Sequence, residues 1–299
     1  MNYRIVHTTR YRYEAPVAIS HNEAHLLPRS FAGQTLTGGR LDIQPPCSDY
    51  RDRQDYFGNT ASYFAILQPH QDVTITATCD VRLTAQRRQL WLGGDMDWQQ
   101  ARQRLAAPND AELLDAMQFC LDSPLVRAEA ALHEYAAGSF APGRPLTDAV
   151  ADLMTRIHAD FAYDPAATDV TTPPLEVLRR RRGVCQDFAH LAIGCLRSLG
   201  LAARYVSGYL ETVPPPGQAK LAGADASHAW LQVYLPDVGW QDWDPTNNLQ
   251  PSDRHVVTAW GRDYSDVPPL KGIIYGGGDN HTIDVQVDVT PLPDTPNAS

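Results

Sequence analysis

The spacing of hydrophobic residues has two different periods along the chain, and the first region has the period of β-strands. Residues 3–13 are rich in aromatic and β-branched side chains, and residues 72–83 alternate between apolar and polar positions. The apolar positions of the second segment share one face: Val73, Ile75, Ala77, Cys79, Val81 and Leu83. Prolines and glycines separate such segments. The pattern predicts an N-terminal all-β, sandwich-like domain over residues 1–88.

Helical spacing begins after a less regular stretch. Residues 89–130 contain several glycines and prolines and predict a connector that is partly helical. Residues 146–161 then carry apolar side chains three and four positions apart, and predicted helices and strands alternate up to residue 290. This mixture predicts an α+β catalytic domain over residues 131–290. The prolines within residues 291–299 predict a flexible tail.

A helix with a candidate nucleophile at its start is predicted from Cys185 to Gly200. Its apolar residues recur on one face: Phe188, Leu191, Ala192, Cys195, Leu196 and Leu199. Cys185 lies three residues before Phe188, so it belongs to the same face at the first turn. The unpaired N–H groups and the dipole of a helix start favour a thiolate. Cys185 is therefore the candidate nucleophile, whereas Cys195 is expected to be a small buried hydrophobe.

A β-hairpin downstream supplies the candidate partners of this thiol. Residues 228–235 alternate between polar and apolar positions, residues 236–239 form the turn, and the return strand ends near Asp244. Antiparallel pairing across this turn places His228 near Asn247, within one or two pair positions of Asp244. Asp242 lies two residues earlier on the same strand face and is a rival for the role of Asp244.

Cysteine, histidine and aspartate together have the chemistry of acyl transfer. A thiolate attacks an amide carbonyl, and a neighbouring histidine takes the thiol proton and later delivers it to the leaving amine. An aspartate orients the imidazole and stabilises its cationic form. In chain order these residues are Cys185, His228 and Asp244. Spacing alone makes this a weak signal, because these residue types occur in most chains.

Three short motifs around these residues resemble those of a known family. They are Gly183-Val-Cys-Gln-Asp-Phe-Ala-His190, Ser227-His-Ala-Trp230 and Trp243-Asp-Pro-Thr-Asn247. They are similar, in order, to the core motifs of the transglutaminase-like superfamily, over roughly residues 130–260. The N-terminal β region and residues 261–267 also resemble the bacterial subgroup of transglutaminase-like cysteine peptidases, which carries an N-terminal β domain.

The resemblance implies a fold and a set of roles. The expected fold is α+β: an N-terminal all-β domain, then a papain-like transglutaminase core whose nucleophile starts a helix packed on an antiparallel sheet. Cys185 corresponds to the nucleophile, His228 to the base and Asp244 to the orienting acid. The oxyanion hole is expected to include the backbone N–H of Cys185.

Other residues near the motifs have two interpretations each. Tyr209 and Trp230 either wall the substrate cleft or belong to the core. Tyr163 is a third candidate for substrate binding, and the sequence does not assign the second oxyanion donor. Asp187 is expected to complement the helix dipole, and His190 to be a hydrogen-bonded structural histidine.

The resemblance leaves the acyl acceptor open. Water gives an amide-bond hydrolase of the peptidase or isopeptidase type, which we expect, acting through a thioester on a peptide or protein substrate. An amine gives a transamidase that acts on protein glutamine. A third alternative is a non-catalytic peptide-binding protein that retains the enzyme core.

Composition and charge argue against several other classes of function. The chain has 299 residues and a formal net charge of −10, which argues against nucleic acid or an anionic membrane as the main partner. No segment is long and apolar enough to suggest a membrane span. The five cysteines are odd in number and without paired spacing, so we expect a reduced, cytoplasmic protein. No spacing typical of metal ligands occurs, and no cofactor is expected.

Overall fold

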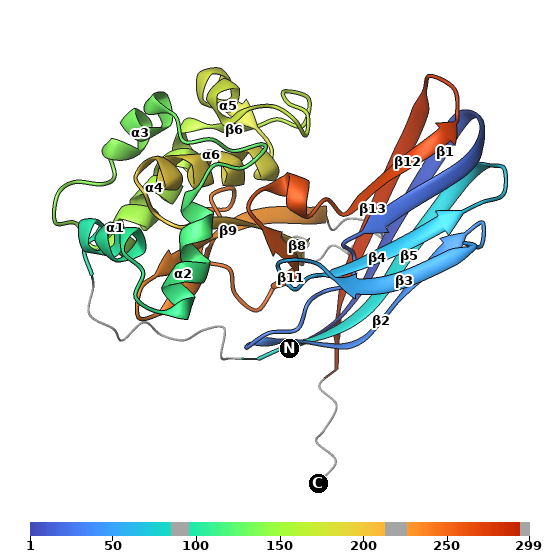
Figure 1. Ribbon diagram of the computed structural model, residues 1–299, viewed down its shortest axis with the longest axis horizontal. Coiled ribbons are helices and arrows are strands. Elements are labelled where there is room, and N and C mark those ends of the chain that lie inside the picture. The colour runs from blue at the N-terminus through green and yellow to red at the C-terminus, as the bar shows by residue number, and fades with distance from the viewer. Residues whose placement is uncertain (85–95, 213–225, 294–299) are drawn as a thin grey trace, which may run out of the picture.

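The computed structural model of the protein describes residues 1–84, 96–212 and 226–293. A broad antiparallel sheet occupies one side of the molecule and the helices occupy the other, with a smaller sheet between them (Figure 1). Among the described residues, no helix has both the length and the apolar character that a membrane crossing requires.

The N-terminal sheet is built around one long strand, β1 (Asn2–Ala24). Its first half pairs with β5 (His70–Leu83) and β13 (His281–Leu292), and its second half pairs with β4 (Thr60–Ile66) and β12 (Leu270–Gly276). The two remaining strands pair outside these: β2 (Gln34–Gln44) with β5, and β3 (Asp49–Gln54) with β4. All pairings are antiparallel, and all six predicted apolar positions of β5 are buried. The predicted all-β region is thus confirmed.

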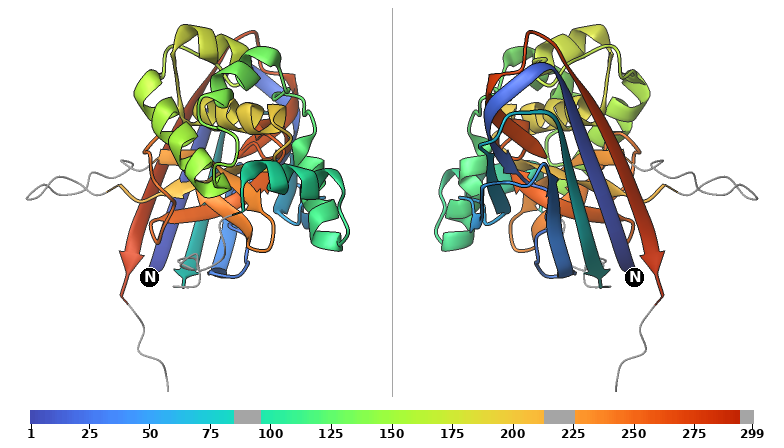
Figure 2. Two further views of the ribbon diagram at one scale, coloured as in Figure 1. Left: turned by 90° about the vertical axis from the view of Figure 1, so that its left-hand side faces the viewer. Right: turned by 90° about the vertical axis from the view of Figure 1, so that its right-hand side faces the viewer.

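Two strands near the C-terminus, β12 and β13, also belong to this sheet. Strands β12 and β13 lie within the range expected for the catalytic domain, yet both pair with β1. Both views in Figure 2 show red β13 beside blue β1. The predicted division of the chain is therefore corrected here: β12 and β13 belong to the N-terminal sheet, and β13 extends two residues into the expected tail. Alternation along a strand reveals which side chains share a face but not which strand becomes its neighbour.

The second domain combines helices with a four-stranded antiparallel sheet in the order β10-β9-β8-β11. Its strands are β8 (Ala203–Leu210), β9 (Ala226–Leu235), β10 (Gly239–Trp243) and β11 (His255–Gly261). Its helices are α1 (Trp98–Ala106), α2 (Ala111–Met117), η2 (Gln118–Cys120), α3 (Ala130–Ala137), α4 (Leu146–Asp160), α5 (Pro174–Arg180), α6 (Cys185–Ser198) and η3 (Tyr264–Asp266). A short parallel pair, β6 (Ala162–Tyr163) and β7 (Arg182–Gly183), precedes α6. Helices α1 and α2 pack into the same apolar core as α6, so the described part of the expected connector belongs to this domain.

Helix α6 is buried on all sides, whereas its apolar stripe predicted a single buried face. Its polar residues are buried because each has partners. Asp187 accepts hydrogen bonds at the helix start, and His190 accepts one from the backbone N–H of Tyr264. Arg197 donates to three backbone carbonyls and to the hydroxyl of Ser123. A hydrogen-bonded polar group can be buried at little net cost, so polarity in the sequence does not predict exposure here.

Strand β11 joins the two domains. The side-chain amide of Gln34 donates to the carbonyl oxygen of Val257 at 2.7 Å and accepts from its N–H at 2.9 Å. The guanidinium of Arg29 lies 3.2 Å from the ring centre of Trp260, a cation–π contact. These contacts fix β11, and the residue at its start, relative to both domains.

Candidate active site

Cys185 is the first residue of α6, and the turn before it is held rigidly. The carboxylate of Asp187 accepts hydrogen bonds from the N–H of Val184 at 2.8 Å and from the hydroxyl of Thr168 at 2.6 Å. Gly183 allows this approach, because a Cβ at that position would lie 2.6 Å from an Asp187 carboxylate oxygen. Asp187 therefore caps the start of α6 through these hydrogen bonds. The backbone that carries the partly buried thiol of Cys185 is therefore held in place.

The predicted hairpin brings His228 and Asp244 together. Nε2 of His228 lies 2.8 Å from Oδ2 of Asp244, and the two side chains are 9% and 0% exposed. Trp243 pairs with Leu231, one residue away from the predicted register. The side-chain amide of Asn247 lies 3.4 Å from the same nitrogen of His228, close to where that register placed it.

The environment of His228 favours its charged form. Burial by itself lowers the pKa of His228, but hydrogen bonds and charge attraction from Asp244 and Cys185 outweigh burial and raise it to about 10. Burial raises the pKa of Asp244, yet its hydrogen bonds to His228, His255 and Asn247, together with the charge of His228, leave it lowered. His228 is therefore an imidazolium near neutral pH. Because Asp244 occupies Nε2, Nδ1 is the nitrogen left for the thiol.

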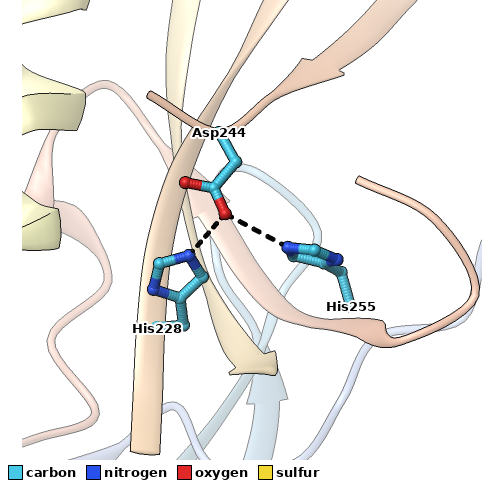
Figure 3. Close-up of side chains that lie close together, drawn as sticks. All are labelled: His228, Asp244 and His255. Carbon is cyan, nitrogen blue, oxygen red and sulfur yellow. Dashed lines mark hydrogen bonds and ion pairs between the residues drawn. The ribbon is translucent and has the colours of Figure 1, made fainter. Parts of the chain in front are cut away.

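Asp244 accepts hydrogen bonds on both carboxylate oxygens. Oδ1 accepts from the backbone N–H groups of Thr246 at 3.0 Å and Asn247 at 3.1 Å. Oδ2 accepts from His228, from the Asn247 side chain at 2.7 Å and from Nε2 of His255 at 3.3 Å. Figure 3 shows both imidazoles directed at the same oxygen.

Sequence reasoning did not identify His255 or assign a role to Asn247. The hairpin register did place Asn247 beside His228, and this was the available signal for it. His255 gave no such signal, because it lies eleven residues after Asp244 on β11, at the opposite edge of the sheet from β10. Only the tertiary fold brings it to the carboxylate.

Asp242, the rival carboxylate, serves a different purpose. Its Oδ1 accepts hydrogen bonds from Nε1 of Trp230 at 2.7 Å and from the side-chain amide of Gln232 at 2.9 Å. It braces β9 and β10 against each other beside the site. The structure thus pairs His228 with Asp244 and assigns Asp242 to packing.

Two of the three expected substrate-binding residues are buried. Trp230 is 0% exposed and packs edge-on against His255, with ring centres 5.3 Å apart. Tyr209 is 2% exposed and hydrogen-bonds through its hydroxyl to His7 of the N-terminal sheet at 3.1 Å. Neither offers a surface to substrate, so their assignment to the cleft is corrected to packing. Alternation had placed both on strands without revealing that a second layer covers them.

Tyr163 differs from these two residues because 58% of it is exposed. It ends β6, and its ring centre lies 6.5 Å from that of Phe188 on α6. Partial burial raises the pKa of its hydroxyl, and the nearby Cys185 and Asp187 raise it further. Tyr163 is thus an exposed aromatic residue beside the thiol.

His190 also lies near the site but is structural. It is 1% exposed, and its Nε2 accepts a hydrogen bond from the N–H of Tyr264 at 3.1 Å. Burial lowers the pKa of His190 to about 4, although Asp263 opposes this effect. Cys195 on the same helix is fully buried, and burial raises the pKa of its thiol to about 12. Its burial in the core confirms the prediction of a small buried hydrophobe.

His228, Asp244 and His255 also form the group of potential metal ligands found among the described residues, with donor atoms within 4.8 Å of one another. The amide N–H of Asn247 points at the same carboxylate oxygen as both imidazoles. An N–H donor directed there suits a hydrogen-bonded anion and would oppose a cation. Each donor directed at Oδ2 of Asp244 is therefore explained by a hydrogen bond to this carboxylate.

A thiol at the N-terminus of a central helix, beside an antiparallel sheet that carries a His–Asp pair, defines a papain-like α+β core. Comparison with known proteins agrees. The family described as the bacterial transglutaminase-like N-terminal region matches residues 3–82, and the transglutaminase-like superfamily matches residues 133–245. The chain belongs to the transglutaminase-like superfamily, in its form with the bacterial N-terminal region.

Individual relatives extend this result. An uncharacterized protein of Mycobacterium tuberculosis strain H37Rv is 43% identical over 97% of this chain and 93% of its own length. A protein-glutamine gamma-glutamyltransferase of Pseudomonas aeruginosa is 34% identical over 43% of this chain and 20% of its own length. The crystal structure of a protein from Cytophaga hutchinsonii, provisionally described as a cysteine protease, has a TM-score of 0.74 at 20% identity. It covers 99% of this chain and 93% of its own, which confirms the predicted fold.

Proposed function

We propose that the protein is a cysteine-dependent amide-bond hydrolase that acts on peptides or isopeptides through a thioester on Cys185. The observation that carries this proposal is the arrangement of His228, which contacts the thiol on one side and is hydrogen-bonded to buried Asp244 on the other. A cationic imidazole beside a cysteine stabilises the thiolate, which is the nucleophilic form.

The geometry supports an ordered set of proton movements. The Cys185 thiolate attacks the amide carbonyl, and the oxyanion that forms is stabilised by N–H groups at the start of α6. The His228 imidazolium donates its Nδ1 proton to the leaving amine, and the amine departs. The acyl group then remains bound to Cys185 as a thioester. The neutral imidazole then takes a proton from water, and the hydroxide attacks the thioester to release the acid and the thiolate. Asp244 keeps the ring oriented throughout.

Tyr163 is the expected substrate-binding residue whose exposure fits that role. The residue is 58% exposed, and it is near enough to Cys185 for the thiol to raise the pKa of its hydroxyl. We assign it to the wall of the cleft, where it contacts the acyl group or the leaving amine.

A transamidase is the second candidate, and one observation favours it. The relative from Pseudomonas aeruginosa is named a protein-glutamine gamma-glutamyltransferase, and it matches part of this chain. Both reactions proceed through the same thioester, and they differ in whether water or an amine resolves it. A peptide-binding protein without activity is the third candidate, and the intact Cys–His–Asp geometry argues against it.

The test uses a panel of peptides, isopeptides and glutamine-containing proteins, with and without a labelled primary amine. Hydrolysis predicts release of free acid by the wild type and none by Cys185→Ala. Incorporation of the amine in preference to hydrolysis would replace hydrolase by transamidase. Equal background turnover in the wild type and Cys185→Ala across the panel, with reductant present, would contradict both activities.

A further inference from the structure

His255 lies at the junction of the hydrogen-bond network and the domain interface. It is 1% exposed at the start of β11, and its Nε2 lies 3.3 Å from Oδ2 of Asp244. Asp244 is fully buried. A buried carboxylate without enough donors is costly, because it has lost its hydration shell. His255 supplies one of the donors that replace this shell.

The strand order alone would not bring His255 to Asp244, since β8 lies between β9 and β11. The side chains explain the approach. On β8 the residue that pairs with His228 is Gly208, which leaves the space beside the imidazole free for Trp230. A Cβ at Gly208 would lie 2.5 Å from the indole ring. His255 then packs edge-on against this indole, with ring planes at 81°.

We propose that His255 is a positioning residue: its Nε2–H fixes the Asp244 carboxylate in the orientation that holds His228 against Cys185 (Figure 3). This inference rests on the proposed function, because positioning matters only if Cys185 reacts. Rotation about the Cβ–Cγ bond of Asp244 is opposed on Oδ1 by the backbone N–H groups of Thr246 and Asn247, and on Oδ2 by His228 and the Asn247 side chain. His255 adds a donor from a separate element, β11, on the oxygen that also holds His228. His255 thus acts through Asp244 and does not touch the reacting atoms.

The role has a consequence for pH dependence. The titratable groups that act on the carboxylate are His228 on β9 and His255 itself on β11. The hydrogen bond from His255 is among the causes of the lowered pKa of Asp244. Its loss raises that pKa, so the carboxylate is protonated at a higher pH. His228 then loses the negative charge that favours its cationic form at a higher pH than in the wild type, and alkylation of Cys185 should slow over the same range.

The experiment measures the alkylation rate of Cys185 by chloroacetamide against pH in the full chain. Mass spectrometry follows the Cys185 peptide, with buried Cys195 as the internal reference. His255→Leu removes the donor and keeps the bulk beside Trp230. His255→Gln places an amide N–H near the position of Nε2 and is the matched rescue variant. Thermal unfolding of each variant reports packing separately.

We expect His255→Leu to react about tenfold more slowly near neutral pH, the lower end of the scale known for loss of hydrogen-bonded groups that orient metal ligands. Its acid limb should move to higher pH. His255→Gln should stay within about threefold of the wild type, with its acid limb unmoved, because it still donates to Oδ2.

Two results would overturn the inference while the proposed function survives. One is a His255→Leu profile identical to that of the wild type. The other is equal slowing of the Leu and Gln variants, which would indicate packing alone. A different failure points to the proposed function itself: if Cys185 reacts no faster in the wild type than in a His228→Ala variant, the thiol is not activated, and His255 has nothing to position.

Discussion

Two buried histidines near Cys185 have opposite protonation behaviour. His190 is 1% exposed, and burial lowers its pKa to about 4. His228 is nearly as buried, yet its pKa is raised to about 10, because Asp244 lies 2.8 Å from Nε2 and the thiol adds to the effect. The partner of His190 is a backbone N–H that donates to it and so favours the neutral ring. Because both rings are buried, the hydrogen-bond partner decides which of the two histidines is favoured as a cation.

Neutralising Asp244 should abolish the difference in protonation between His228 and His190. Asp244→Asn leaves His228 buried without a carboxylate, so the ring should become neutral, as His190 is. We expect the reaction rate at Cys185 to fall by about 10³-fold or more, the scale seen when the orienting carboxylate of a catalytic triad is lost. The measurement is the alkylation rate or, once a substrate is found, kcat/KM.

Asp242→Asn is the matched control for this change. Asp242 is on the same hairpin, but it accepts hydrogen bonds from Trp230 and Gln232. Its loss should lower stability and leave most of the thiol reactivity. A larger loss of reactivity in Asp242→Asn than in Asp244→Asn would show that the wrong carboxylate has been paired with His228.

Gly208→Ala tests the packing that supports His228. The added methyl group would meet the carbonyl oxygen of Val256 at 2.1 Å and the Trp230 ring at 2.5 Å. We expect a loss of about 1–3 kcal/mol in the free energy of unfolding, and slower alkylation because Trp230 is displaced against the site. Denaturant unfolding and the alkylation rate check both effects. Gly38→Ala, with open space around its Cβ, should change neither; comparable losses in both variants would refute the packing argument.

Tyr163→Phe examines the exposed side of the site. It keeps the ring and removes the hydroxyl, so a substrate that hydrogen-bonds to Tyr163 should lose up to about tenfold in kcat/KM. Stability should not change, because the side chain is 58% exposed. Tyr275→Phe, equally exposed on β12, serves as the control. No change in kcat/KM for any substrate would remove the hydroxyl of Tyr163 from the site.

His190→Gln should have the smallest effect at neutral pH and a clear one in acid. The glutamine oxygen can still accept from Tyr264, so alkylation of Cys185 should stay within about threefold of the wild type. Between the unfolded pKa of 6.5 and the folded pKa of about 4, unfolded chains bind a proton that the folded protein does not. His190 therefore costs stability as pH falls through this window, by at most about 1.4 kcal/mol per pH unit.

The measurement is the free energy of unfolding against pH for His190→Gln and the wild type. The variant should lose less stability than the wild type between pH 6.5 and 4. Exposed His133 replaced by Gln is the control and should follow the wild type. Parallel curves for His190→Gln and the wild type would mean that His190 is not held neutral.

Local sequence patterns predicted those parts of the molecule that local geometry decides. The helix from Cys185 and the hairpin were both placed within about two residues of their ends, which is the usual uncertainty of such boundaries. The hairpin register even placed Asn247 beside His228. Each of these rests on contacts between residues near one another in the chain.

The parts that the sequence did not reveal depend on long-range contacts. Strand β13 alternates like any strand, and nothing in it shows that it pairs with β1. His255 lies on β11, at the opposite edge of the sheet from β10, the strand that precedes Asp244. Trp230 and Tyr209 looked equally suited to a cleft or a core, and only the packing of the N-terminal sheet and β11 shows that they are buried.

The central claim is that Asp244 keeps His228 protonated beside Cys185, and an NMR titration of the histidine rings tests it most directly. Selective replacement of His228 and His190 assigns their signals in the folded protein. We predict that the His228 ring stays protonated through neutral pH and titrates near 10, whereas the His190 ring stays neutral down to about pH 4. A His228 ring that is already neutral at pH 7 would contradict the account.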